Sequence, residues 1–234
     1  MLISPSTLRS VFRIPPVSVL HVGAHMAEEE EDYKLNGFGP ITWVECNPSL
    51  VETLRKKIKP PDNFIESCIG DENGREVVFY IAGASSSIFE RIGHDRKFPT
   101  TVPKISIRMI MSRLDNLLDE QNTPKLLNLD IEGSELDAIK GMGNLIKQVQ
   151  FIYLEVTRAG WGNHPDYKQI NKELKLLGFR KVGIHWHWQN GFGDAVYFRD
   201  KPSVLNGLRI RMYFLHINYR RFKDAAKRTF LNKR

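Results

Sequence analysis

The chain has 234 residues, of which 41% are hydrophobic and 26% are charged, as in an ordinary protein with one sizeable folded domain. It has no run of about 18 apolar residues, which argues against a membrane-spanning helix, and residues 1–16 lack the apolar stretch of a signal peptide. Its two cysteines exclude a disulfide framework and a cysteine-rich zinc site. We therefore expect a cytoplasmic location.

The net charge of +7 is concentrated at the C-terminus. Residues 209–234 contain nine Lys and Arg and a single acid, Asp224, so this segment carries +8 and residues 1–208 together carry −1. A nearly neutral body does not support a protein whose whole surface coats nucleic acid, and nucleic acid is not an expected partner.

Short apolar runs alternate with amphipathic stretches along the body. The predicted strands are 17–22, 41–45, 64–68, 77–81, 105–111, 125–130, 151–156, 180–188 and 195–199. The predicted helices are 27–36, 49–58, 134–142 and 164–177. Apolar strands that alternate with helices favour a mostly parallel sheet covered on both faces, here closed by a C-terminal antiparallel hairpin. We expect an N-terminal extension (1–16), one Rossmann-like α/β domain (17–200) and a C-terminal helix (201–234).

Two residues that follow predicted strands suggest a nucleoside-containing cofactor. Gly23 follows the first strand, where a glycine lets the backbone approach a ligand at a helix N-terminus. Glu45 ends the second strand, about 20 positions further on, where a carboxylate can accept both ribose hydroxyls. A simple turn at Gly23 and an exposed glutamate at the strand end are the structural alternatives. The absence of a complete G-x-G-x-x-G sequence argues against a nicotinamide dinucleotide.

Several further motifs extend this pattern across residues 17–199. They are His21-Val22-Gly23-Ala24-His25, Trp43-Val44-Glu45-Cys46-Asn47-Pro48, Ser67-Cys68-Ile69-Gly70-Asp71, Ser85-Ser86-Ser87, Arg113-Leu114-Asp115, Leu129-Asp130-Ile131-Glu132-Gly133-Ser134-Glu135 and Tyr153-Leu154-Glu155. With these motifs the sequence resembles the FkbM family of S-adenosylmethionine-dependent methyltransferases. Two positions depart from the family pattern: His25 stands where the family usually has Asn, and Ala27 where it often has a second Gly.

The resemblance implies a class I methyltransferase fold with S-adenosylmethionine as cofactor and S-adenosylhomocysteine as product. It places the methionyl group near the loop after the first strand, the ribose at Glu45 and the adenine near the end of the third strand. The predicted cofactor-binding residues are Gly23, Ala24, His25, Glu45, Cys46, Asn47, Ser67, Cys68 and Asp130.

Transfer of a methyl group to a hydroxyl is helped by a base that takes the proton. The candidates are Asp130, Glu155, His164, His185 and His187. Each of these histidines has a structural role as its alternative, as does Asp130, and a helix-cap or loop-staple role is favoured for Glu135. A divalent metal held by Asp130, Glu155 and a histidine is left open, and no metal ligand is assigned.

We expect an O-methyltransferase that acts on a sugar hydroxyl in a glycan, polysaccharide or glycosylated natural product, because the FkbM family is associated with such acceptors. The alternatives are a methyltransferase for RNA or another macromolecule, and a non-catalytic S-adenosylmethionine-binding scaffold.

The C-terminal segment has apolar residues at intervals of three or four, with Arg and Lys beside them. They are Leu208, Met212, Leu215, Tyr219, Phe222, Ala226 and Phe230. A basic amphipathic helix of this kind suits an anionic membrane surface or a partner. Docking on its own domain or on a second copy is the equally weighted alternative. Peripheral attachment to a membrane is thus one expected location.

Overall fold

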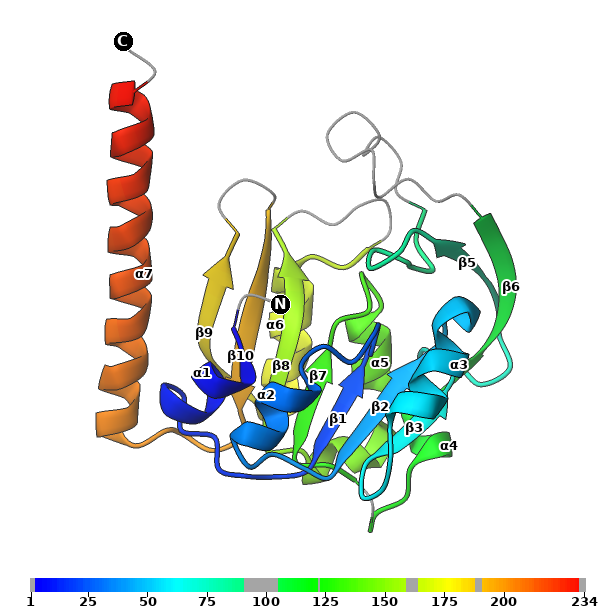
Figure 1. Ribbon diagram of the computed structural model, residues 1–234. Helices are drawn as coiled ribbons and strands as arrows, with labels where there is room; N and C mark the ends of the chain where they lie inside the picture. The colour runs from blue at the N-terminus through cyan, green and yellow to red at the C-terminus, as the bar shows by residue number, and fades with distance from the viewer. Residues whose placement is uncertain (1–2, 91–104, 122, 159–163, 188–190, 232–234) are drawn as a thin grey trace.

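The computed structural model describes residues 3–90, 105–121, 123–158, 164–187 and 191–231, with side chains up to residue 217 and that of Tyr219. A seven-stranded sheet in the order β3-β2-β1-β7-β8-β10-β9 forms its centre (Figure 1). The strands are β1 (Val19–Val22), β2 (Ile41–Glu45), β3 (Asn63–Glu66), β7 (Leu126–Leu129), β8 (Phe151–Thr157), β9 (Arg180–Trp186) and β10 (Phe192–Phe198).

The strands from β3 to β8 run parallel to their neighbours, and β10 runs antiparallel to both β8 and β9. The predicted class I methyltransferase fold, mostly parallel with a C-terminal antiparallel hairpin, is therefore confirmed. Of the residues predicted for the last two strands, Trp188 lies outside the described residues.

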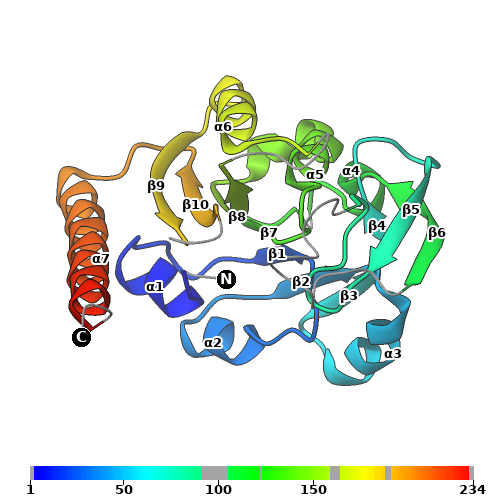
Figure 2. The same cartoon turned by 90° about the horizontal axis from the view of Figure 1, so that it is seen from above.

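Helices cover both faces of the sheet, as Figure 2 shows from above. One face carries α1 (Pro5–Ser10), α2 (Glu30–Leu35) and α3 (Pro48–Lys57), and the other carries α4 (Leu114–Leu117), α5 (Glu135–Gly141), the 3₁₀ helix η2 (Gly143–Gln148) and α6 (Tyr167–Leu176). Two apolar clusters form the core, one on each side. The carboxyl ends of the parallel strands consequently meet at one edge, where open α/β sheets bind their ligands.

Two helices begin later than the sequence predicts, for local reasons. Helix α2 begins at Glu30 rather than at residue 27, because Ala27 has a left-handed backbone (φ +52°) that a right-handed helix cannot contain. Helix α6 begins at Tyr167 because Asp166 caps it, accepting from the Gln169 backbone amide at 2.9 Å while the Gln169 side chain accepts from the Asp166 amide.

The predicted strand 64–68 is two strands in different sheets, so the single-strand prediction is wrong. The Ser67 amide still bonds to the carbonyl of Glu45 at 3.1 Å, after which the chain leaves β2. β4 (Cys68–Ile69) then joins a second sheet, of order β4-β6-β5, with β5 (Glu76–Ile81) and β6 (Ile105–Ser112).

Residues 3–14 belong to the packed body, although residues 1–16 were predicted to be an extension. Ile3, Leu8, Phe12 and Ile14 are fully buried in the cluster that also contains parts of β1 and β2. The amide of Ile3 donates to Asp194 Oδ2 at 3.0 Å. Residues 3–14 therefore pack as part of the domain and not as a separate unit. Residues 1–2 lie outside the described part of the chain.

Helix α7 (Val204–Leu231) follows β10 and stands beside β9 at the edge of the sheet (Figure 1). Residues 232–234 of the predicted segment lie outside the described residues. In the part of the chain that the structure describes, no helix combines the length and apolar character needed to span a membrane.

Candidate cofactor site

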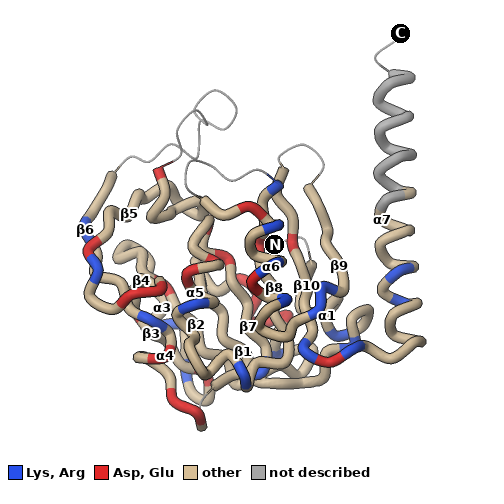
Figure 3. The backbone as a smooth tube through the Cα atoms, turned by 180° about the vertical axis from the view of Figure 1, so that it is seen from behind, with Lys and Arg blue, Asp and Glu red and all other residues tan. Residues whose placement is uncertain are grey.

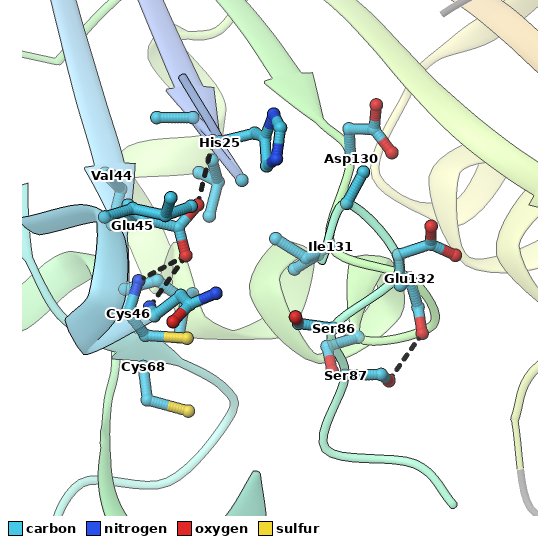
Figure 4. A pocket seen from close by; sticks show the side chains of 18 of the residues that line it. His25, Val44, Glu45, Cys46, Cys68, Ser86, Ser87, Asp130, Ile131 and Glu132 are labelled. Atoms are coloured by element: carbon cyan, nitrogen blue, oxygen red, sulfur yellow. Dashed lines mark hydrogen bonds between the residues drawn. The ribbon is translucent and has the colours of Figure 1, made fainter. Parts of the chain in front are cut away.

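A cavity of about 340 Å³ opens at the carboxyl ends of β1, β2 and β7. Figure 4 shows its two walls, with His25, Glu45, Cys46 and Cys68 on one side and Ser86, Ser87, Asp130, Ile131 and Glu132 on the other. All nine residues predicted to bind the cofactor line this one cavity: Gly23, Ala24, His25, Glu45, Cys46, Asn47, Ser67, Cys68 and Asp130.

Gly23 is required by the geometry of the loop after β1. Its φ is +88°, and a Cβ added there would lie 1.9 Å from the carbonyl oxygen of Asp130. The amides of Gly23 and Ala24 both donate to the carbonyl of Val44 at 2.9 Å. The loop is thereby held between the ends of β2 and β7, and no side chain fits between it and Asp130.

The Glu45 carboxylate is fixed by three backbone amides. Its Oε2 accepts from the amide of His25 and its Oε1 from those of Cys46 and Asn47, each at 2.8 Å. A carboxylate has about four acceptor positions, so at least one remains for a ligand. This nearly buried group joins the loop after β1 to the end of β2 and also faces the cavity.

The opposite wall contains residues that were not predicted as site residues. Ser86, Ser87 and Ile88 follow β5, and the Ser87 hydroxyl donates to the carbonyl of Glu132 at 2.7 Å. The Ser-rich segment between two extended stretches was the available signal. Its position over the cavity depends on contact with a loop 45 residues away.

Three non-glycine residues at the site have left-handed backbones: His25 (φ +46°), Ala27 (φ +52°) and Glu132 (φ +51°). Such conformations cost on the order of 1 kcal/mol each and gather at functional sites. His25 and Ala27 are the two positions at which the sequence departs from the family pattern. Asn and Gly, the residues usual in the family, are those that adopt this conformation most readily.

The thiols of Cys46 and Cys68 face each other at one end of the cavity (Figure 4). A hydrogen bond between them raises the pKa of Cys46 and lowers that of Cys68, and burial also raises the pKa of Cys46. Both cysteines are free thiols.

The lining of the cavity is acidic. Among the described residues that line it there is no Lys or Arg, and five of them are acids: Glu28, Glu29, Glu45, Asp130 and Glu132. Such a lining disfavours a dinucleotide, whose pyrophosphate needs positive charge or a glycine-rich amide cradle. It suits a ligand that carries positive charge.

The predicted catalytic residues Asp130, Glu155 and His185 lie along one row across the sheet. In the register of the strands Glu155 lies opposite Asp194, and Asp194 opposite His185. Asp130 follows Leu129, the partner of Leu154, and its carboxyl group hydrogen-bonds to that of Glu155. Only Asp130 of these predicted bases reaches the cavity.

Burial raises the pKa of Asp130, and the negative charge of Asp194 adds to this increase. The pKa of Glu155 is also raised, first by burial and then by repulsion from Glu132 and Asp130. A hydrogen bond between two carboxyl groups requires one of them to hold a proton, and the raised pKa of both groups favours a proton held by the pair.

His164 and Glu155 line a separate small pocket behind Glu132. The His164 ring packs against Gly133, where a Cβ would lie 2.2 Å from its Cδ2 atom, and its Nδ1 donates to the carbonyl of Pro165 at 2.7 Å. His185 lies on β9, which β8 and β10 separate from the strand that Asp130 follows. Neither histidine lines the cofactor cavity. His164 is held in the small pocket, and His185 is held on β9.

Glu135 holds the loop after β7 in place, the structural role that the sequence favours for it. Its carboxyl group accepts from the amides of Ile131 at 3.2 Å and Gly133 at 3.1 Å, closing the loop between β7 and α5. Burial raises its pKa to about 8. Within the described residues, no group of three or more His, Cys, Asp or Glu side chains is arranged to hold a metal ion.

The profile of the Methyltransferase FkbM domain matches residues 21–181, which include both walls of the cavity. The chain belongs to the FkbM methyltransferase family. The resemblance inferred from the motifs is thereby confirmed, together with S-adenosylmethionine, the cofactor of this family. No protein of curated function matches the sequence.

The comparison with solved structures gives matches at low sequence identity. FkbM methyltransferase from Methylobacillus flagellatus KT superposes with a TM-score of 0.51 at 16% identity, over 78% of this chain and 43% of that one. This chain therefore spans less than half the length of that relative. Magnesium protoporphyrin IX methyltransferase from Synechocystis PCC 6803, with bound SAM, gives a TM-score of 0.45 at 12% identity, over 84% and 79% of the two chains.

The residues present fit S-adenosylmethionine. The cavity volume lies within the range of about 300–1,000 Å³ usual for small-molecule sites. The cofactor contains a sulfonium and an ammonium group but no phosphate, which agrees with five acidic lining residues and no Lys or Arg among those described. Glu45 faces the cavity with an acceptor position left for a hydroxyl, and Gly23 allows the backbone to come close to a ligand.

Proposed function

We propose that the protein transfers a methyl group from S-adenosylmethionine to a hydroxyl oxygen of a sugar in a glycan, polysaccharide or glycosylated natural product. The observation that carries the proposal is the acidic cavity bounded by Gly23, Glu45 and Asp130 at the ends of three neighbouring parallel strands. The sugar acceptor is inferred from the family association and from the polar oxygen groups around the cavity.

The wall opposite Glu45 suits a neutral polyhydroxy acceptor. Ser86, Ser87, Asp130 and Glu132 offer hydroxyl and carboxylate oxygens, which form hydrogen bonds with sugar hydroxyls. The same carboxylates oppose the approach of a phosphate backbone, so this wall favours a sugar over the alternative RNA acceptor.

The proposed reaction needs one base. When bound, S-adenosylmethionine would supply the methyl group to the acceptor oxygen and keep the electron pair of the carbon–sulfur bond on sulfur, and Asp130 would take the hydroxyl proton. A carboxylate whose pKa is raised by burial suits this role, because a base is most effective with a pKa near the working pH. Glu155 acts as a positioning residue through its hydrogen bond to Asp130.

Binding of S-adenosylhomocysteine, followed by calorimetry, tests the cofactor site first. We expect Glu45→Ala to weaken binding about 100-fold, since a hydrogen bond to a charged group is lost and three loop amides lose their acceptor, and Glu45→Gln about 10-fold. Glu52→Ala, an exposed change on α3, is the matched control and should leave the affinity unaltered.

Turnover tests the acceptor. Wild-type protein is incubated with S-adenosylmethionine and a panel of oligosaccharides or RNA, and release of S-adenosylhomocysteine is measured. Methylation of a saccharide hydroxyl supports the proposal. Turnover with RNA alone would establish the alternative acceptor, and cofactor binding without any turnover would favour a non-catalytic scaffold. A folded wild-type protein that binds no cofactor would contradict all three.

A further inference from the structure

The helix α7 has two apolar faces, and only one of them is covered. The inner face packs on the body: Ile210 is 3% exposed, and Phe12 contacts the rings of Tyr213 and Phe214, each at 6.1 Å between centroids. Asn206 donates to the carbonyl of Phe12 at 2.7 Å. A Cβ at Gly183 of β9 would lie 2.0 Å from Phe214, so this ring fills the space that the glycine leaves.

The outer face carries exposed apolar side chains from Val204 to Tyr219, the part of α7 whose side chains the structure describes. Six of the eleven large hydrophobic side chains that are exposed in the described residues lie here, each between 53% and 80% exposed. They are Val204, Leu205, Leu208, Met212, Leu215 and Tyr219. The spacing of three and four residues puts them on one side of the helix, and an apolar stripe of this size marks an interaction surface.

Positive charge borders this stripe. Arg209 and Arg211 are exposed on α7, and residues 201–219 contain no acid. A groove of about 590 Å³ between α7 and β9 has an apolar floor, with Arg180, Lys181 and Lys201 around it. Figure 3 shows the blue segments in the described part of α7 and on the neighbouring β9 edge. Residues 220–231 add five Lys and Arg and a single acid.

The charge argues against a second copy as the occupant. Two α7 helices packed by this stripe would bring Arg209 and Arg211 close to basic residues of the other copy. Paired helices are stabilised by opposite charges beside the apolar seam, and the segment has almost no acid to supply them. The occupant that matches both the apolar stripe and its basic border is an apolar layer with an anionic surface.

We propose that the outer face of α7, together with the basic groove beside β9, binds the surface of a membrane containing anionic phospholipid. The helix lies in the interface with Leu208, Met212 and Leu215 among the acyl chains, while the arginines and lysines contact lipid phosphates. The inner face stays on the body, so the domain is carried to the membrane without unfolding. This inference is independent of the methyl acceptor.

Vesicle flotation with the full chain tests the proposal. We compare vesicles of phosphatidylcholine alone with vesicles that also contain phosphatidylglycerol, at low and high salt. Binding is expected only with the anionic vesicles, and it should weaken as the salt concentration rises. Arg209→Glu with Arg211→Glu should weaken binding at least about 25-fold, since each cation contributes roughly fivefold. Leu208→Asn with Met212→Asn should abolish it.

Matched controls separate the surface from general effects. Lys56→Glu on α3 with Lys59→Glu just after it changes the net charge equally, and Leu176→Asn removes an exposed leucine from α6; both variants should bind vesicles like wild type. All changed side chains are exposed, so thermal unfolding and S-adenosylhomocysteine binding should be unaltered. This separates failure of the membrane proposal from failure of the cofactor site.

Three outcomes would overturn the inference. The first is an absence of binding to anionic vesicles by the folded wild-type protein. The second is binding that both α7 variants retain. The third is a dimer, detected by analytical ultracentrifugation, that the double variant Leu208→Asn with Met212→Asn converts to a monomer while the variant still binds vesicles like wild type. The last result would assign the stripe to a second copy of the chain.

Discussion

The cofactor cavity and helix α7 differ in both charge and exposure. The cavity is acidic, and its polar groups are held by backbone amides at the ends of buried strands. Helix α7 is basic and exposes six large apolar side chains. The net charge of the whole chain is +7, a value that describes neither region. The proposed chemistry and the proposed membrane attachment therefore belong to separate surfaces, so changes in one should leave the other intact.

The strongest way to separate the two regions is a pair of glycine substitutions. Gly23→Ala would put a Cβ 1.9 Å from the Asp130 carbonyl oxygen, at a φ of +88°. We expect a loss of about 4 kcal/mol or more of stability and no detectable cofactor binding, measured by thermal unfolding and calorimetry. Gly207→Ala in α7 is the control, because a Cβ there meets nothing within 4 Å. Equal behaviour of the two variants would contradict the geometry described for Gly23.

Asp130→Asn should separate chemistry from binding within the cavity. Removal of the base is expected to lower turnover by about 100-fold while cofactor affinity changes by less than about threefold. The measurement is kcat with saturating cofactor and acceptor. His164→Ala is the comparison, since His164 lies outside the cavity. A larger loss of turnover in His164→Ala than in Asp130→Asn would transfer the role of the base to His164.

Glu135→Gln sharpens the account of the buried carboxyl groups. The folded-state pKa of about 8 lies above the ordinary value of 4.5, so the folded protein binds the extra proton between these limits. This stabilisation is complete below about pH 4.5 and is lost as the pH rises through 8. We expect the melting temperature of wild type to fall more steeply between pH 6 and 9 than that of Glu135→Gln. Parallel slopes in the two proteins would show that Glu135 ionises normally.

The smallest expected effect concerns His25, whose left-handed backbone conformation slightly destabilises the loop after β1. His25→Asn should change stability by less than about 0.5 kcal/mol and retain the cofactor, because Asn tolerates this conformation. His25→Val should cost about 1–2 kcal/mol and weaken cofactor binding. The two variants are compared by chemical unfolding and calorimetry. A stable, tightly binding valine variant would refute the backbone explanation.

The fold and one half of the site follow from local sequence signals. Apolar runs identify the parallel strands, and the residues directly after β1 and β2 line the cavity because strand ends meet at one edge. Gly23 and Glu45 are recognisable because their residue types and spacing reflect local geometry. By contrast, only the backbone angles reveal that His25 and Ala27 occupy left-handed positions.

The remaining features depend on contacts between distant parts of the chain. Ser87 reaches the cavity by bonding to a residue 45 positions away, and Ile3 is placed by Asp194, 191 positions away. The histidines could not be ranked from sequence, because strand register and loop packing decide which of them reaches the cavity. His164 and His185 are held elsewhere, whereas Asp130 continues a strand whose end opens directly into the site.

The contact between Phe12 and α7 joins the segment just after α1 to the helix that follows β10, across a separation of 194 residues for the bond from Asn206. Because a ribosome makes a chain from its N-terminus onward, Phe12 and its apolar neighbours have no covering helix until α7 has emerged. Completion of this part of the core therefore follows the synthesis of the strands of the central sheet. A nascent chain stalled before residue 204 would leave these aromatic surfaces open to chaperones.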